Sequence, residues 1–156
     1  MTRKTRPFWE IKSLEAMSQQ EWESLCDGCA LCCLHKLEEE DTGDIYYTRV
    51  ACRQLDATSC RCRVYPQRQA HVPDCVQITP QLVRTTRWLP RSCAYRRLAE
   101  GRGLPDWHPL ITGDPASTVQ AGVSIRGKFI SENKMGDAAL EDCLLEDRTL
   151  LALIGG

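Results

Sequence analysis

The sequence predicts a small, loop-rich α+β domain whose short helices and hairpins are held together by cysteine–metal sites. Its 156 residues are the length of a single domain. Its helix-like and strand-like segments are short and are separated by prolines and turn signals. Nine of its ten cysteines lie within residues 26–93, so metal ligation can supply the stability that a small core lacks. We therefore expect one metal-binding domain over residues 1–156, with its core at 18–135 and with the N-terminal arm and the C-terminal helix at its periphery.

A helix and then a β-hairpin are predicted in the first third of the chain. Ser18-Gln19-Gln20-Glu21 has the spacing of a capping box and starts a helix that continues to Leu25. A short strand is expected over residues 34–37. After the turn signal at 41–44, the β-branched and aromatic residues 45–50 predict the second strand of the hairpin.

The rest of the chain predicts further short helices between irregular stretches. Caps at their starts, and prolines or glycines after them, mark the helix ends. The predicted helices are residues 80–88, 93–100 and 115–121, and a last helix from Asp137 that has Leu140, Leu144 and Leu145 on one face. The proline-containing stretches 63–74 and 104–113 are predicted to be irregular, and residues 127–132 to be a strand.

The hydropathy pattern predicts a cytoplasmic protein without a membrane partner. The basic start at Arg3-Lys4 is not followed by the apolar run of a secretory signal peptide. No apolar run approaches the ~18 residues that span a bilayer. Thiols are kept reduced in the cytoplasm, so a chain with ten cysteines there favours metal binding over disulfide bonds.

Charge is distributed unevenly along the chain. The net charge of -1 excludes a basic nucleic-acid tail and an acidic solvating chain. Residues 49–102, however, contain eleven arginines, no lysine and three acids. Three interpretations stay open: the arginines pair with carboxylates inside the fold, they offset the negative charge of metal–thiolate sites, or they bind an anion, an RNA or a protein partner.

Cys26-x-x-Cys29-x-x-Cys32-Cys33 is the strongest chemical signal in the sequence. Two thiolates separated by two residues can hold one metal ion from a single turn, and soft sulfur ligands select zinc, copper(I) or iron–sulfur chemistry. Because the side chains of neighbouring residues diverge, we expect Cys32 and Cys33 to serve different sites, or only one of them to be a ligand.

The remaining cysteines complete the candidate ligand set. Cys60-x-Cys62 places both sulfurs on one side of an extended segment. The candidate metal ligands are Cys26, Cys29, Cys32, Cys33, Cys52, Cys60, Cys62, Cys75 and Cys93. Cys143, which lies among leucines, is expected to be a small buried apolar residue instead.

Three histidines are weaker candidates for a nitrogen ligand or a general base. They are His35, His71 and His108, and a surface or packed histidine is the more common finding. His108 is the best of them because the Trp107-His108-Pro109 sequence restricts its position. No catalytic triad, phosphate loop or dinucleotide fingerprint is present.

The cysteine pattern resembles the CxxCxxCC cysteine-cluster family of bacterial proteins, described as zinc- or iron-chelating, and most of all its YcgN-like branch. The resemblance covers roughly residues 7–135. Its motifs are Leu25-Cys26-Asp27-Gly28-Cys29, Val50-Ala51-Cys52-Arg53, Cys60-Arg61-Cys62, Val72-Pro73-Asp74-Cys75, Leu89-Pro90-x-x-Cys93-Ala94-Tyr95-Arg96 and Trp107-His108-Pro109-Leu110. It implies metal chelation in a bacterial cytoplasmic protein and names neither the metal nor a reaction.

The sequence therefore predicts a metal-binding protein that chelates zinc or iron, an iron–sulfur cluster included. One alternative is a metal-dependent enzyme in which His108 acts as acid or base and arginines hold an anionic substrate. Another is a metal-scaffolded module that binds RNA or a protein through residues 49–102. A thiol redox protein built on Cys26 and Cys29 is disfavoured because it needs only one pair of cysteines.

Overall fold

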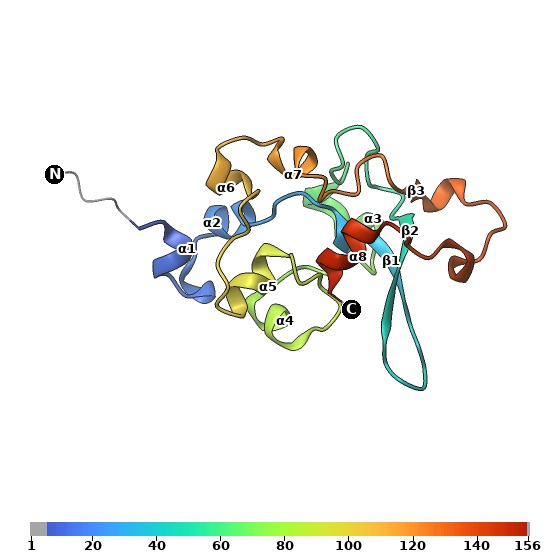
Figure 1. Ribbon diagram of the computed structural model, residues 1–156, viewed down its shortest axis with the longest axis horizontal. Helices are drawn as coiled ribbons and strands as arrows, with labels where there is room; N and C mark the ends of the chain where they lie inside the picture. Colours follow the sequence, from blue (N-terminus) through green and yellow to red (C-terminus); the bar gives the residue numbers. More distant parts are fainter. Residues whose placement is uncertain (1–5, 156) are drawn as a thin grey trace.

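A small three-stranded sheet and a set of short helices, most of them to one side of the sheet, make up residues 6–155, the part of the chain that the computed structural model describes (Figure 1). The sheet has the order β1 (Leu34–Glu38), β2 (Ile45–Ala51) and β3 (Ile130–Ser131). Strands β1 and β2 are antiparallel, and β3 adds to β2 in the parallel direction. This arrangement confirms the predicted loop-rich α+β class.

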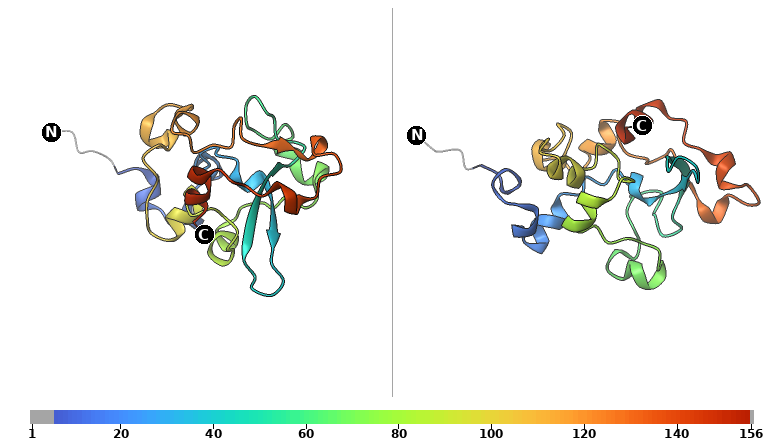
Figure 2. Two further views of the ribbon diagram at one scale, coloured as in Figure 1. Left: turned by 45° about the vertical axis from the view of Figure 1, so that its right-hand side comes forward. Right: turned by 90° about the horizontal axis from the view of Figure 1, so that it is seen from below.

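The β1–β2 hairpin forms where the sequence predicts it, and its far end projects from the body of the molecule (Figures 1 and 2). The acidic residues 38–44 at that end are exposed. The base of the hairpin is anchored instead: Tyr47 is 5% exposed and its hydroxyl donates a hydrogen bond to the carbonyl of Trp88.

The helices are one or two turns long, and none within residues 6–155 combines the length and apolarity needed to cross a membrane. The α-helices are α1 (Phe8–Ile11), α2 (Gln19–Ser24), α3 (Arg68–His71), α4 (Pro80–Thr85), α5 (Ala94–Ala99), α6 (Pro109–Thr112), α7 (Ser117–Gln120) and α8 (Arg148–Ile154). The 3₁₀ turns are η1 (Leu14–Ala16), η2 (Leu31–Cys33), η3 (Tyr65–Gln67), η4 (Glu132–Lys134) and η5 (Leu140–Cys143). The capping box of α2 is confirmed, with Ser18 Oγ accepting from the Glu21 N–H at 3.1 Å and Glu21 Oε1 from the Ser18 N–H at 2.9 Å.

Several predicted boundaries are wrong for local reasons. Helix α4 ends at Thr85 rather than at residue 88, because the β-branched Thr86 adopts an extended conformation. The stretches predicted to be irregular contain helical turns, among them α6, whose first amides are capped by the His108 side chain. The strand predicted over 127–132 is reduced to β3.

The last helix begins later in the chain than predicted, at Arg148 instead of near Asp137. Between these positions the backbone pairs with strand β2 of the sheet. Leu144 forms a bridge with Thr48, and the Leu145 N–H donates to the Tyr47 carbonyl at 2.9 Å. Leu144 and Leu145 therefore cannot occupy one face of a helix.

Replacing Asp147 with alanine should destabilise the fold by about 1 kcal/mol, since Asp147 is the N-cap of α8 and accepts from the Leu150 N–H at 3.0 Å. That hydrogen bond, helped by Lys128, lowers the pKa of Asp147. A lowered pKa stabilises the fold at neutral pH, and this contribution is lost in acid. Urea unfolding should therefore show a difference between wild type and variant that shrinks below about pH 4. A difference that is constant with pH would contradict the role of the carboxylate.

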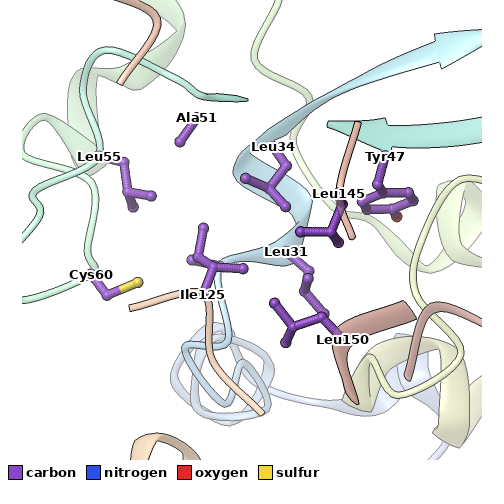
Figure 3. Packing of buried hydrophobic residues seen from close by; sticks show 10 residues of the cluster. Leu31, Leu34, Tyr47, Ala51, Leu55, Cys60, Ile125, Leu145 and Leu150 are labelled. Atoms are coloured by element: carbon purple, nitrogen blue, oxygen red, sulfur yellow. The ribbon is translucent and has the colours of Figure 1, made fainter. Parts of the chain in front are cut away.

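Two apolar clusters form the core, and the cysteine-rich turn after α2 connects them. The first cluster contains Ala30, Leu31, Leu34, Tyr47, Ala51, Leu55, Cys60, Ile125, Leu145 and Leu150 (Figure 3). The second contains Leu14, Trp22, Leu25, Val83, Leu89 and Tyr95, and α1 packs against it through Phe8 and Trp9. Leu25 and Leu31 are both fully buried, one in each cluster, so the turn between them is fixed at both ends.

Candidate metal centre

The segment from Cys26 to Cys33 is a compact turn rather than a continuation of α2. Gly28 and Ala30 both have left-handed backbones, with φ of 77° and 63°, and η2 follows. Glycine adopts this conformation readily, whereas for alanine it costs about 1–2 kcal/mol. Buried packing of Ala30 in the first cluster offsets this strain. The turn therefore has a defined shape before any ligand is considered.

Five thiols gather around this turn, and we call them the first thiol group. They are Cys26, Cys29, Cys32, Cys33 and Cys93. Burial raises the pKa of Cys26 to about 12, and the negative charges of Cys32, Asp27 and Cys93 add to the effect. Cys26 keeps exposed surface, yet the protein around its sulfur removes much of the water that a thiolate needs. Cys93, at the start of α5, is affected in the same way by Cys32 and Asp27.

Backbone N–H groups oppose these increases at three of the sulfurs. The N–H group of Gly28 acts to lower the pKa of Cys26, and that of Leu31 acts to lower the pKa of Cys29, two residues further along in each case. Cys93 occupies the N-cap position of α5, where its side chain makes no capping hydrogen bond, and the nearby N–H groups of Arg96 and Tyr95 act to lower the pKa of its thiol. A hydrogen bond to sulfur stabilises the thiolate, which is the form that binds metal.

Cys32 and Cys33 influence each other's charge, and their assignment to different sites stays a prediction. The interaction between the two thiols acts to lower the pKa of Cys32 and to raise that of Cys33. Cys32 and Cys33 are the last residues of η2, and β1 begins at Leu34. The direction of their side chains therefore follows neither a helical nor a strand pattern. The charge of Cys52 also acts to raise the pKa of Cys33, so Cys33 of the first thiol group interacts with a cysteine of the second group described below.

Lys36 supplies a positive charge beside the first thiol group. Its Nζ donates to the carbonyls of Cys32 at 3.0 Å and Leu34 at 2.7 Å, and it lies 4.8 and 5.1 Å from the ring centres of Tyr47 and Trp88. Burial lowers the pKa of Lys36, and the nearby thiolates act against that change. Sequence reasoning missed this residue. Its available signal was that it is the one basic side chain among residues 26–48.

A second thiol group consists of Cys52, Cys62 and Cys75, all half-buried. Burial raises the pKa of Cys75, and the charges of Cys52 and Cys62 contribute. The Cys52 N–H donates to the Cys33 carbonyl at 3.0 Å, which ties this group to the end of the first one.

Two cysteines lie in the apolar core. Cys60 is 4% exposed in the first cluster, where the Ser124 hydroxyl donates to its sulfur at 3.7 Å (Figure 3). Its φ of 57° is left-handed, so the Cys60–Cys62 segment is not extended as predicted. Cys143 is 3% exposed, in agreement with the small apolar residue expected there.

The structure places the three histidines in different settings. His108 is fully buried and both of its ring nitrogens are bonded to the backbone of Leu25 and Leu110. His35 Nε2 lies 2.6 Å from Glu132 Oε2. His71 is exposed, and its carbonyl accepts from Arg53 at 2.8 Å. The role of His108 as an acid or base is disfavoured because neither nitrogen is free.

Carboxylates of the fold pair with five of the eleven arginines in residues 49–102. The pairs are Arg53–Glu132, Arg63–Asp56, Arg84–Glu15, Arg96–Glu100 and Arg102–Glu100. Pairing inside the fold, one of the three interpretations of the arginine-rich segment, therefore applies to these residues.

The thiol groups fit zinc or iron by their chemistry. Soft sulfur donors, backbone N–H groups near the sulfurs and a neighbouring ammonium all favour a bound thiophilic cation. Across residues 6–155, however, no three Cys, His, Asp or Glu side chains are close enough to hold a metal ion as they stand. Ligation would require the sulfurs to move closer together.

Comparison with known proteins gives the same chemistry. Residues 25–94 match the family model CxxCxxCC, described as a "Putative zinc- or iron-chelating domain". A UPF0260 protein of Rhodopseudomonas palustris is 57% identical over 92% of this chain and 85% of its own length. UPF0260 proteins of Nitrobacter hamburgensis (60% identical, 86% and 80% covered) and Cellvibrio japonicus (57% identical, 90% and 95% covered) are similar too. No solved structure matches. The chain therefore belongs to the UPF0260 family of bacterial proteins, with a CxxCxxCC domain at residues 25–94.

Proposed function

We propose that this protein binds zinc or iron at two cysteine centres. The first centre uses Cys26, Cys29, Cys32 and Cys93, and the second uses Cys33, Cys52, Cys62 and Cys75. The adjacent pair Cys32–Cys33 thus contributes one thiolate to each centre. Cys60, the ninth candidate of the sequence, stays in the apolar cluster and is not a ligand in this proposal.

One observation carries the proposal. Thiols from two distant segments, Cys26 and Cys29 after α2 and Cys93 at the start of α5, lie in one electrostatic environment, and nearby backbone N–H groups act to lower the pKa of each. Such donors have little purpose at an inert thiol, and they stabilise a thiolate bound to a cation. Four cysteines are a complete ligand set for zinc and for an iron–sulfur cluster.

Charge supports the same assignment. Four thiolates around a divalent ion leave a net charge of about -2, which is costly in a partly buried site. The Lys36 ammonium is held beside the first centre by two carbonyls and two aromatic rings, and it offsets part of that charge. Bound metal would join the turn after α2 to α5 and act as a structural cross-link.

The cytoplasm is the compartment that fits this chemistry, and we propose it for this protein. All ten cysteines are free thiols in the structure, the state that a reducing compartment maintains. The alternative of an RNA or protein partner rests on the arginine content of residues 49–102, and five of those arginines are already paired within the fold.

Metal analysis of anaerobically purified protein tests the proposal. We expect about two zinc ions per chain, or iron together with acid-labile sulfide and a brown colour if the centres are iron–sulfur clusters. Protein that carries neither zinc nor iron in stoichiometric amount, and that takes up neither when reconstituted under reducing conditions, would refute it.

A further inference from the structure

The loop at Trp107 and His108 packs against the turn that carries Cys26 and Cys29. The His108 ring is fully buried; its Nδ1 accepts from the Leu110 N–H at 3.0 Å, and its Nε2 donates to the Leu25 carbonyl at 2.7 Å. These two partners fix one neutral tautomer, with the proton on Nε2. The backbone directly before Cys26 is therefore held by a side chain from a distant loop.

Trp107 contacts the same turn further along the chain, through the carboxylate of Asp27. Its indole N–H donates to Asp27 Oδ2 at 3.1 Å, and Asp27 Oδ1 accepts from the Cys29 N–H at 3.1 Å. Both oxygens of Asp27 are thus bonded within the fold. Asp27 links Trp107 to Cys29 and is not placed as a further metal ligand.

Ser117 and Thr112 hold the loop at Trp107 in place. The Ser117 hydroxyl donates to the Trp107 carbonyl at 2.5 Å, and the Thr112 hydroxyl donates to Ser117 Oγ at 2.9 Å. Ser117 is 8% exposed, so these bonds are shielded from water. These bonds fix the positions of Trp107 and His108, and the two residues in turn fix the shape of the turn that carries Cys26 and Cys29.

We infer that Trp107 and His108 are positioning residues for the first centre, which set the Cys26–Cys29 turn before a metal ion arrives. The inference rests on the proposed function and deepens it. Both residues lie outside residues 25–94, the part that matches the metal-chelating domain. A turn whose shape is fixed in advance loses less conformational freedom on ligation, so its metal affinity is higher. Hydrogen-bonding partners of ligand-bearing segments typically contribute 10–100-fold to metal affinity.

Zinc(II) titration against a chromophoric chelator, with full-length protein under anaerobic conditions, tests this inference. Trp107→Phe keeps the aromatic ring and removes the N–H, and it should weaken zinc binding about 10-fold. His108→Leu should weaken it by about 10–100-fold, and His108→Gln, which restores a donor near the Nε2 position, should recover part of that loss. Trp9→Phe, a matched change in α1, should leave the zinc affinity unchanged.

Hydrogen exchange of zinc-free protein provides a second readout that needs no metal. The peptide containing residues 25–30 should exchange faster in Trp107→Phe than in wild type or Trp9→Phe, because the Cys29 amide loses its support. Unchanged exchange, or zinc affinity equal to that of the control while only thermal stability falls, would overturn the inference. If wild type binds neither zinc nor iron, the proposed function fails, and the exchange comparison still decides whether Trp107 shapes the turn.

Discussion

Replacing Cys93 with serine is expected to abolish metal binding at the first centre and to halve the metal content of the protein. In the proposed ligand set Cys93 is the one thiol of this centre that comes from α5 rather than from the turn after α2. A serine hydroxyl is a hard, protonated group at neutral pH and is a poor ligand for a thiophilic metal. The affinity of that centre should fall by more than about 100-fold, the upper end of what a supporting hydrogen bond contributes.

Two other cysteines supply matched controls for this experiment. Cys143→Ala removes a buried thiol outside both thiol groups, and Cys60→Ala removes one from the first apolar cluster. Both variants should keep the full metal content and lose stability only through packing. Elemental analysis together with chelator competition makes the comparison. Full metal content in Cys93→Ser would remove Cys93 from the ligand set, and loss of metal in Cys60→Ala would add Cys60 to it.

Removing the metal should lower the thermal unfolding midpoint by about 8–16 °C. Ligand bound only to the native state stabilises it by about 4 kcal/mol at a thousandfold excess over Kd, and 1 kcal/mol shifts the midpoint of a domain of this size by about 2–4 °C. The effect is large here because regular structure is scarce: the longest helix, α8, has seven residues. Bound metal would therefore supply part of the stability that longer helices and strands supply in other folds.

The measurement is differential scanning calorimetry of native and chelator-treated protein under reducing, anaerobic conditions. Cys93→Ser gives the internal control, since chelation should shift its midpoint by a smaller amount. An unchanged midpoint in chelated wild-type protein would show that the metal centres contribute nothing to folding stability. The chelator must remain present in the metal-free sample during the scan. Otherwise residual metal could bind to the unfolded chain and reduce the difference between the two midpoints.

Local signals made the early elements predictable. The capping box at Ser18 and the turn between β1 and β2 depend on residues close in sequence, and both are present in the structure. The last helix could not be located in this way. The backbone at Leu144 and Leu145 bonds to β2, a segment about a hundred residues earlier, and this tertiary pairing overrides the helical spacing of the leucines.

The candidate site was likewise predictable where the signal is local and not where it depends on tertiary contacts. Spacing could predict a candidate set of cysteines, because CxxC and CxxCC patterns are local. It could not show that Cys60 turns into the core, which depends on a left-handed backbone and on the space beside Ile125. Nor could it show that His108 uses both nitrogens on the backbone, or that Lys36 folds back over Tyr47 towards the thiols. These placements are decided by packing between distant segments.

The position of the cysteine-rich turn between the two apolar clusters has a consequence for how the protein unfolds. Leu25 belongs to one cluster and Leu31 to the other, and the proposed ligands Cys26 and Cys29 lie on the chain between them. With metal bound, the joint is rigid, and the two clusters are expected to unfold as a single cooperative unit. Without metal this added cross-link between the clusters is absent, and each cluster is expected to open more readily by itself, which would raise the sensitivity of the chain to proteolysis. Metal supply in the cell would then set the lifetime of this chain as well as its occupancy.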